Sequence, residues 1–258
     1  MYLAPMSITK AQRQEIRQLK RRQGRVSQRK VLVEGEKCIL ELCRSPWTVE
    51  RIYFTEPWED ASIWTLNAHM QAIPRLNVSA KDMEMMSAVK TPPGILAVAE
   101  WPEDVEALPQ AGGMVLYLDD VADPGNVGTL IRVADWFGLG GVILSPRCAD
   151  ALSPKALQSA MGSTFHISTA VMPFAELPDA HKQNVIGLDA GGQNLFDAGA
   201  MSSPSLLVVG SESHGLSSEI REACHSIASI PGAGRAESLN ASVAGAIATS
   251  AFVQKGLA

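Results

Sequence analysis

Residues 115–137 read VLYLDDVADPGNVGTLIRVADWF, and this stretch decides the fold. The unalternating apolar run at 115–118 is typical of a strand that is buried on both faces. The Pro-Gly pair at 124–125 then forces a turn, and Asn126 can cap the helix that we expect over 128–137. The stretch therefore predicts a strand, a loop and a helix of an α/β domain.

Four further short apolar runs continue this rhythm, with helical segments between several of them. The predicted strands are 142–144, 185–188, 206–209 and 227–230, and the predicted helices are 154–161, 217–223 and 239–252. Apolar strands that alternate with helices predict a parallel sheet covered on both faces. Ligands of such sheets bind outside the carboxyl ends of the strands, so the residues after each strand matter most.

Three of these strand ends carry unusual loops. Besides 119–132, they are GSESHGL at 210–216 and PGAGRAESLNAS at 231–242. Taken alone, Gly210 is explained as a turn residue and Glu212 as a surface acid. Three such loops at the edge where ligands bind indicate a functional site instead.

The first hundred residues predict a smaller α/β unit. We expect helices over 7–22 and 36–43 and strands over 31–33, 51–54 and 95–99. A stretch rich in Pro and acidic residues then resembles an interdomain linker. The predicted division is a domain over 1–100, a linker over 101–113 and a domain over 114–258.

Nine basic residues and one acidic residue lie within 10–30, although the whole chain has a formal charge of −5. Such a local excess of positive charge attracts a polyanion, and we expect RNA or DNA as the partner. The ordinary alternative is a solvated basic helix. The residues assigned to nucleic-acid binding are Arg17, Lys20, Arg21, Arg22, Arg25, Arg29 and Lys30.

Composition excludes several classes of protein. The chain has 258 residues, 46% of them hydrophobic, which is ordinary for a globular protein. No apolar run reaches the ~18 residues of a membrane span, and residues 1–10 do not resemble a secretory signal. The four cysteines form no CxxC pair and have no His at zinc spacing, so we expect neither a disulfide framework nor a metal site. A soluble, cytoplasmic protein is predicted.

The stretches DPGNVGTLIRVADWFG, GSESHGLS and IPGAGRAESLNASVA resemble motifs 1, 2 and 3 of the SpoU/TrmH RNA 2′-O-ribose methyltransferases. The motifs start at residues 123, 210 and 230, and the resemblance covers 115–255. KVLVEGEKCILE, which starts at residue 30, is more loosely similar to the ribosomal-protein-like RNA-binding domain of many members.

The resemblance implies a fold and a reaction. The parallel sheet would carry a deep trefoil knot, and the protein would be a homodimer that binds S-adenosylmethionine in the knotted loops. The substrate would be a ribose 2′-OH of structured RNA, with ribosomal RNA favoured and transfer RNA as the alternative. No GxGxxG follows the strand at 115–118, which fits a different cofactor loop.

The resemblance also assigns roles to five catalytic residues. Arg132 would hold the target phosphate and stabilise the 2′-alkoxide; the alternative of a base suits a guanidinium poorly. Asn126 would fix Arg132 or the ribose, and Glu212 would pair with Arg132 or orient the hydroxyl. Ser238 and Asn240 would line the reaction centre.

Backbone groups around the cofactor are implied by the same motifs, with glycines in tight loops. The cofactor-binding residues are Leu188, Asp189, Ala190, Gly210, Gly215, Ile230 and Leu239. Gly232 stands where the family usually has Met, a change that would loosen the cofactor pocket.

Two other functions and one assembly question stay open. Ser213 and His214 suggest a hydrolase, but GSESHG does not match G-x-S-x-G. An RNA-binding protein with a decayed transferase domain is the other alternative. The uncharged helix at 239–252 either packs wholly within its own subunit or shares a twofold interface, as the resemblance favours. A bulky charge at Ala244, Ala248 or Ala251 would distinguish these two cases.

Overall fold

The computed structural model divides the chain into two compact units. Unit 1 comprises Met1–Glu103 and Leu152–His166, and unit 2 comprises Asp104–Ala151 and Ile167–Ala258. The residues described are 8–58, 64, 70, 72–103, 107–197 and 202–257. Ser7, the first residue of the predicted first helix, and residues 104–106, within the predicted linker, lie outside them. Our domain boundaries stay a prediction.

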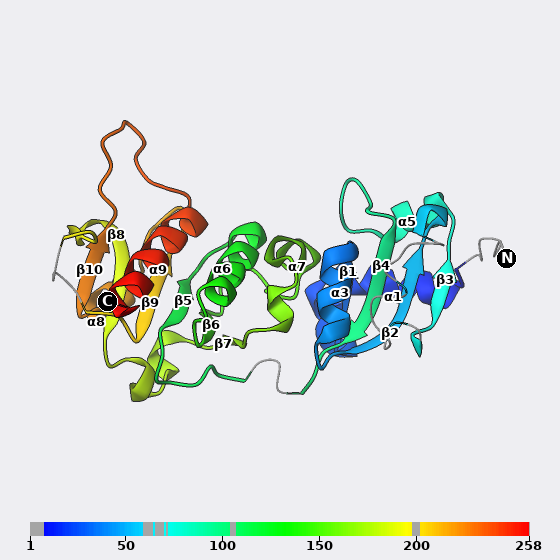
Figure 1. Ribbon diagram of the computed structural model, residues 1–258, viewed down its shortest axis with the longest axis horizontal. Helices are drawn as coiled ribbons and strands as arrows, with labels where there is room; N and C mark the ends of the chain where they lie inside the picture. Colours follow the sequence, from blue (N-terminus) through cyan, green and yellow to red (C-terminus); the bar gives the residue numbers. More distant parts are fainter. Residues whose placement is uncertain are drawn as a thin grey trace. The chain divides into compact units, whose positions relative to one another are not determined.

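Unit 1 contains a mixed four-stranded sheet in the order β1-β4-β2-β3 (Figure 1). Its strands are β1 (Lys30–Glu34), β2 (Thr48–Phe54), β3 (Arg75–Asn77) and β4 (Ile95–Glu100). β4 pairs antiparallel with β1 and β2, and β2 pairs parallel with β3. The three strands predicted here are confirmed, whereas β3 was missed because its three residues form no apolar run.

The helices of unit 1 are short. They are α1 (Lys10–Leu19), α2 (Arg22–Gln28), α3 (Glu36–Arg44), α5 (Ala80–Met86) and α7 (Pro154–Ala160), with 3₁₀ turns at Glu56–Trp58 and Ser163–Phe165. The single helix predicted over 7–22 is wrong. The described helix begins after Thr9, whose side chain accepts a hydrogen bond from Gln12 N at 3.2 Å, and a second helix turns back at Arg22. Gly24 permits this turn, because a Cβ there would lie 2.2 Å from Gln18 O.

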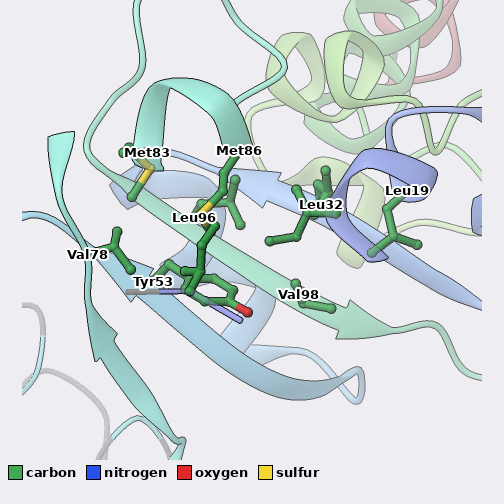
Figure 2. Packing of buried hydrophobic residues seen from close by; sticks show 10 residues of the cluster. Leu19, Leu32, Tyr53, Val78, Met83, Met86, Leu96 and Val98 are labelled. Atoms are coloured by element: carbon green, nitrogen blue, oxygen red, sulfur yellow. The ribbon is translucent and has the colours of Figure 1, made fainter. Parts of the chain in front are cut away.

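The core of unit 1 explains why α1 is basic on one side only. Ile16 and Leu19 share one face of α1 at helical spacing and are fully buried. Figure 2 shows Leu19 near the residues contributed by the sheet and by α5. Those residues are Leu32, Tyr53, Leu96 and Val98 of the sheet and Met83 and Met86 of α5, and Val78 joins them from the segment between β3 and α5. Packing of the apolar face leaves the arginines on the rest of α1 exposed.

Unit 2 contains a six-stranded sheet in the order β10-β8-β9-β5-β6-β7, and every neighbouring pair is parallel (Figure 1). Its strands are β5 (Val115–Asp119), β6 (Gly141–Leu144), β7 (Thr169–Val171), β8 (Val185–Asn194), β9 (Leu206–Gly210) and β10 (Ser226–Ser229). The predicted α/β class with a parallel sheet is confirmed. The short β7 was missed, and β8 runs six residues past its predicted end at Leu188. The trefoil knot stays a prediction.

The helices of unit 2 cover both faces of this sheet. They are α6 (Pro124–Trp136), α8 (Ser218–Ala223) and α9 (Ala241–Leu257), with 3₁₀ turns at Phe174–Glu176 and Asp179–His181. α6 and α9 pack against each other, because Gly245 brings α9 so close that a Cβ would lie 2.4 Å from the Leu130 side chain. Tyr117 instead contacts Phe174 and belongs to a cluster with Ile220 of α8. Within the described residues, no helix is long and apolar enough to span a bilayer.

Two helix starts differ from the sequence prediction for the same reason. The expected cap of α6 was Asn126, but Asp123 takes that role and accepts hydrogen bonds from Gly125 N and Asn126 N at 2.7 and 3.2 Å. α9 begins at Ala241 rather than 239, because Asn240 Oδ1 accepts from Ser242 N at 2.9 Å. Because Asp123 caps α6, the side chain of Asn126 can form hydrogen bonds elsewhere.

Candidate functional site

The strand order places the site. β5 lies between β6 and β9, and the chain runs outward from β5 on one side before it crosses to β8 and β9 on the other. Such a reversal of strand order opens a crevice at the carboxyl ends of the strands. All three motif loops follow strands of this sheet and meet at that edge.

Asn126 joins the three loops. Its Nδ2 donates to Glu212 Oε1 of motif 2, and its Oδ1 accepts from Asn240 Nδ2 of motif 3 at 3.0 Å. Both halves of the amide are therefore used, each by a different loop. The sequence prediction brought these three residues together, and the structure shows the hydrogen bonds that hold them.

Asn240 is itself fixed by the helix that it caps. Its Oδ1 accepts from Ser242 N at 2.9 Å, from Ser242 Oγ at 2.6 Å and from Val243 N at 3.3 Å. Since the oxygen faces α9, the amide nitrogen turns toward Asn126. This arrangement sets the Asn126 amide so that its nitrogen donates to the carboxylate of Glu212, which orients that carboxylate before any ligand binds.

Arg132 lies on α6 and is exposed. Of the two roles predicted for Glu212, the ion pair with Arg132 is not formed: Glu212 Oε1 accepts a hydrogen bond from Asn126, and none of the described residues pairs with the guanidinium. The other role, orientation of the hydroxyl, stays a prediction. An exposed guanidinium without an internal partner is available to a phosphate or a developing oxyanion.

A cavity of about 710 Å³ lies beside this cluster. Its volume falls in the range of roughly 300–1,000 Å³ typical of small-molecule sites. Glu212 and Ser238 line it, together with every residue that we assigned to the cofactor. The latter are Leu188, Asp189, Ala190, Gly210, Gly215, Ile230 and Leu239. The structure thus brings the predicted cofactor residues to one cavity.

An irregularity in β8 supplies one wall of the cavity. Ile227 of β10 pairs with Gly187, but the next residue, Ala228, pairs with Gln193. Residues 188–192 therefore leave the ladder, and the first three of them reach the cavity. This bulge explains why β8 is longer than predicted, and it puts backbone that is not paired with β10 beside the ligand space.

The motif 2 loop forms a second wall. Ser211 N donates to Gly215 O at 3.0 Å, and Gly215 N donates to Ser211 O at 2.9 Å. Gly215 has a φ of +67°, and a Cβ on Gly210 would lie 2.4 Å from the carbonyl carbon of Gly215. Both positions require glycine to close this loop. Ser213 and His214 are exposed on it and share no hydrogen bond within the described chain, which gives the hydrolase alternative no support.

The motif 3 loop forms the open side. Residues 231–240 are all exposed, and a Cβ on Gly232 or Gly234 would have nothing within 4 Å. Gly232, the position where the family usually has Met, therefore lines the cavity beside open space. The loosened pocket stays a prediction that agrees with this open space.

Sequence reasoning missed several residues of the site. Glu237 and Ser229 line the cavity, and Ser229 Oγ donates to Ala190 O at 3.1 Å. Asp119 is buried and accepts from Ser217 N at 2.6 Å, which ties the end of β5 to the end of the motif 2 loop. Ser229 and Glu237 lie next to the predicted Ile230 and Ser238, and Asp119 is the last residue of β5, so proximity to the motifs and to a strand end was the available signal.

The basic residues of unit 1 divide into two groups. Arg17, Arg21, Arg22 and Arg29 are exposed. Arg25 is an exception, because it is only 3% exposed and its Nη1 donates to Leu19 O at 2.9 Å. Its assignment to nucleic-acid binding is corrected: its guanidinium holds the end of α1.

The two lysines of this set are also engaged within unit 1. Lys20 Nζ donates to Ser87 O at 2.6 Å, and burial lowers its pKa while Glu34 opposes that shift. Lys30 Nζ lies 3.2 Å from Glu15 and 2.6 Å from Glu50. Within the predicted nucleic-acid-binding set, the exposed positive charge is therefore carried by arginines.

Residues 113–250 match the model of the SpoU rRNA Methylase family, and residues 11–97 match an MRM3-like substrate binding domain. The first match covers the sheet of unit 2 and all three motifs. The second runs from α1 to the middle of β4 and so includes β1, β2 and β3 of unit 1.

Relatives and solved structures that align over nearly the whole chain are also methyltransferases. The chain is 32% identical to the 23S rRNA (guanosine(2553)-2′-O)-methyltransferase RlmP of Bacillus subtilis, over 93% of this chain and 96% of that protein. The solved SpoU methyltransferase AviRb of Streptomyces viridochromogenes, in complex with AdoMet, aligns with a TM-score of 0.83 and 26% identity over 97% of this chain and 99% of that chain. An AdoMet-bound rRNA methyltransferase of Sinorhizobium meliloti aligns with a TM-score of 0.81 and 26% identity, over 98% and 97%.

Proposed function

The chain belongs to the SpoU rRNA methylase family, and from this premise we propose that it transfers the methyl group of S-adenosylmethionine to a ribose 2′-OH of ribosomal RNA. It is an RNA methyltransferase that uses S-adenosylmethionine. The choice of the 2′-OH is supported by the name of the Bacillus subtilis relative.

One observation carries the proposal. Asn126, Glu212 and Asn240 come from three loops that are far apart in sequence, and they form one hydrogen-bonded cluster beside a ligand-sized cavity. A non-catalytic RNA-binding protein would have no need for this orientation of a carboxylate. A decayed transferase domain is therefore disfavoured.

The cavity fits S-adenosylmethionine. The bulge at 188–192 and the Gly210–Gly215 loop bring backbone groups close to the ligand space, and the glycine-rich loop at 231–234 leaves room above it. Leu188, Ile230 and Leu239 supply apolar contacts for an adenosine ring. When bound, S-adenosylmethionine supplies an electrophilic methyl group on a sulfonium.

Side chains of the cluster and of neighbouring residues bind and orient the ribose of the RNA. A 2′-OH is weakly acidic, so the site must orient it and stabilise the alkoxide that develops at O2′. Glu212, held by the Asn126 amide, orients the hydroxyl by accepting its hydrogen bond. Arg132 holds the adjacent phosphate and stabilises the alkoxide with its planar fork. Ser238 lines the cavity and contributes a hydroxyl near the ribose.

Recognition of the RNA is assigned to unit 1. The exposed guanidiniums of Arg17, Arg21 and Arg22 would contact phosphates, which supply much of the affinity for nucleic acids. The match to a substrate binding domain supports this assignment. Ribosomal RNA is the proposed substrate, and it implies action in the cytoplasm; transfer RNA is an outcome of the test below.

A homodimer through α9 completes the proposal. Ala248 of α9 is fully buried against its own unit, whereas Ala251 lines an open groove of about 620 Å³. Phe196, 55% exposed, lines the groove, and Trp136 at the end of α6 is 81% exposed. Exposed aromatic side chains beside an apolar groove are typical of an interaction surface, and a second copy of the chain would cover them. The trefoil knot is proposed on the family resemblance.

The test is transfer of a labelled methyl group to unmodified total RNA, followed by mapping of the labelled nucleotide. The expected result is one 2′-O-methylated nucleotide in ribosomal RNA. Label in transfer RNA would show that transfer RNA, not ribosomal RNA, is the substrate. Label on a base would show that the ribose 2′-OH is not the acceptor. Binding of S-adenosylmethionine without any transfer of label would contradict the activity.

A further inference from the structure

The charged side chains that line the cavity all have one sign. They are Asp189, Glu212 and Glu237, and no Lys, Arg or His is among the described residues of its wall. Arg235 belongs to the same loop as Glu237, but it is exposed and does not line the cavity. Every charged side chain that a ligand meets on this wall is therefore acidic.

One of the three acids is compensated and two are not. The Asp189 carboxylate forms an ion pair with Arg221 of α8 and accepts from Gly191 N at 3.0 Å. Glu212 is bound by a neutral amide, which orients the carboxylate without cancelling its charge. Glu237 has no ion-pair partner within the part of the chain that the structure describes.

The two forms of the cofactor differ in this charge. S-adenosylmethionine carries a sulfonium, and S-adenosylhomocysteine, which remains after methyl transfer, carries a neutral thioether. Their adenosine, ammonium and carboxylate groups are the same. The ratio of the two dissociation constants therefore isolates the effect of charge at the sulfur. At the dielectric of water, a carboxylate about 4 Å from a cation changes such a ratio about fivefold, and partial exclusion of water increases the effect.

We propose that Glu237 is a specificity-determining residue that favours the sulfonium over the neutral product, and that Arg221 limits this preference by neutralising Asp189. The inference rests on the proposed function, because it assumes that this cavity holds the cofactor. Its consequence is directional: loss of the positive charge on methyl transfer weakens binding, so the product leaves and a new cofactor enters.

The test is calorimetric titration of the full chain with S-adenosylmethionine and with S-adenosylhomocysteine, at low and high salt. Glu237→Gln should lower the preference for the sulfonium about fivefold to tenfold, mainly by weakening that ligand. Arg221→Gln should raise the preference about threefold, because it frees the Asp189 charge. Glu222→Gln, an exposed acid on α8 outside the cavity wall, is the matched control and should change neither constant.

Salt gives an independent reading, since screening should weaken binding of the sulfonium and leave the thioether nearly unaffected. Equal losses for both ligands in Glu237→Gln, or an unchanged ratio, would overturn the inference. Failure of the unaltered protein to bind either ligand would contradict the proposed function instead, so the two failures are distinguishable.

Discussion

The polar cluster of unit 2 and the basic helices of unit 1 are organised in opposite ways. In the cluster, Asn126 is bonded to both Glu212 and Asn240, so each side chain is positioned by another. On the helices, the guanidiniums of Arg17 and Arg21 project without an ion pair to any described residue. Residues that share hydrogen bonds act as a unit, whereas separate charges add their effects. Substitutions in the cluster of unit 2 should therefore have effects that depend on one another. Substitutions of the exposed arginines of unit 1 should each lower the attraction for RNA by a separate increment.

The largest expected effect is at Arg132. Arg132→Ala should reduce methyl transfer by at least about a hundredfold, the scale of losing one transition-state electrostatic partner. Affinity for S-adenosylmethionine should stay within about twofold, because Arg132 does not line the cavity. Steady-state transfer and calorimetry together check both parts. Arg132→Lys should rescue little, since an ammonium lacks the planar fork; a variant with more than half of the original turnover would exclude Arg132 from the reaction centre.

Next in size is the groove on α9. Ala251→Glu should weaken the dimer at least about thirtyfold, because an unpaired charge would be buried between two apolar surfaces. Light scattering across a concentration series measures this, and a folded monomer is the expected product. The matched variant Ala248→Glu should unfold unit 2 instead, because Ala248 is buried within its own subunit. A 27.6 kDa monomer for the unaltered protein at micromolar concentration would remove the dimer from the account.

A smaller effect is expected at the glycine that closes the motif 2 loop. Gly210→Ala should weaken cofactor binding about tenfold, because its Cβ would lie 2.4 Å from the Gly215 backbone and the loop must shift. Gly234 lines the same cavity, but a Cβ there would have nothing within 4 Å. Gly234→Ala should therefore weaken cofactor binding at most about twofold. Calorimetry of both variants separates loop geometry from a general intolerance of alanine. Equal losses would contradict the assigned role of Gly210.

The smallest effects are expected on the basic helices. Arg17→Ala and Arg21→Ala should each weaken RNA binding a few-fold and reduce the salt slope by about one, with effects that add. Arg25→Ala should leave the salt slope unchanged and lower the melting temperature, because its buried guanidinium bonds to Leu19 O. Filter binding at several salt concentrations checks the first statement, and thermal unfolding checks the second. A flat salt dependence in the unaltered protein would argue against phosphate contacts.

The sequence predicted most of this arrangement where a local pattern carries it. Unalternating apolar runs identify β5, β6 and β9, because a strand buried on both faces must be apolar throughout. The loops after β5, β9 and β10 identify the site, because parallel strands bring their carboxyl ends to one edge of the sheet. All the residues predicted for the cofactor line one cavity as a result.

Other features depend on contacts that no local pattern reports. The bulge of β8 depends on its pairing with β10 across almost forty residues of sequence. The break between α1 and α2 depends on the approach of Gly24 to Gln18 O. Arg25 reads as an exposed charge in a basic run, yet it turns inward to bond a carbonyl. Glu212 does not pair with Arg132, which was one of its two predicted roles, because Asp123 caps α6 and the Asn126 amide bonds the Glu212 carboxylate.

The central claim is that Asn126 of motif 1 and Glu212 of motif 2 act as one hydrogen-bonded unit, and a double-mutant cycle on methyl transfer tests it most directly. Asn126→Ala and Glu212→Gln are measured singly and together, with kcat/KM as the readout. If Asn126 works by orienting Glu212 and each change costs about thirtyfold, the double variant should lose about thirtyfold to a hundredfold. A loss near a thousandfold, the product of two independent effects, would contradict the claim.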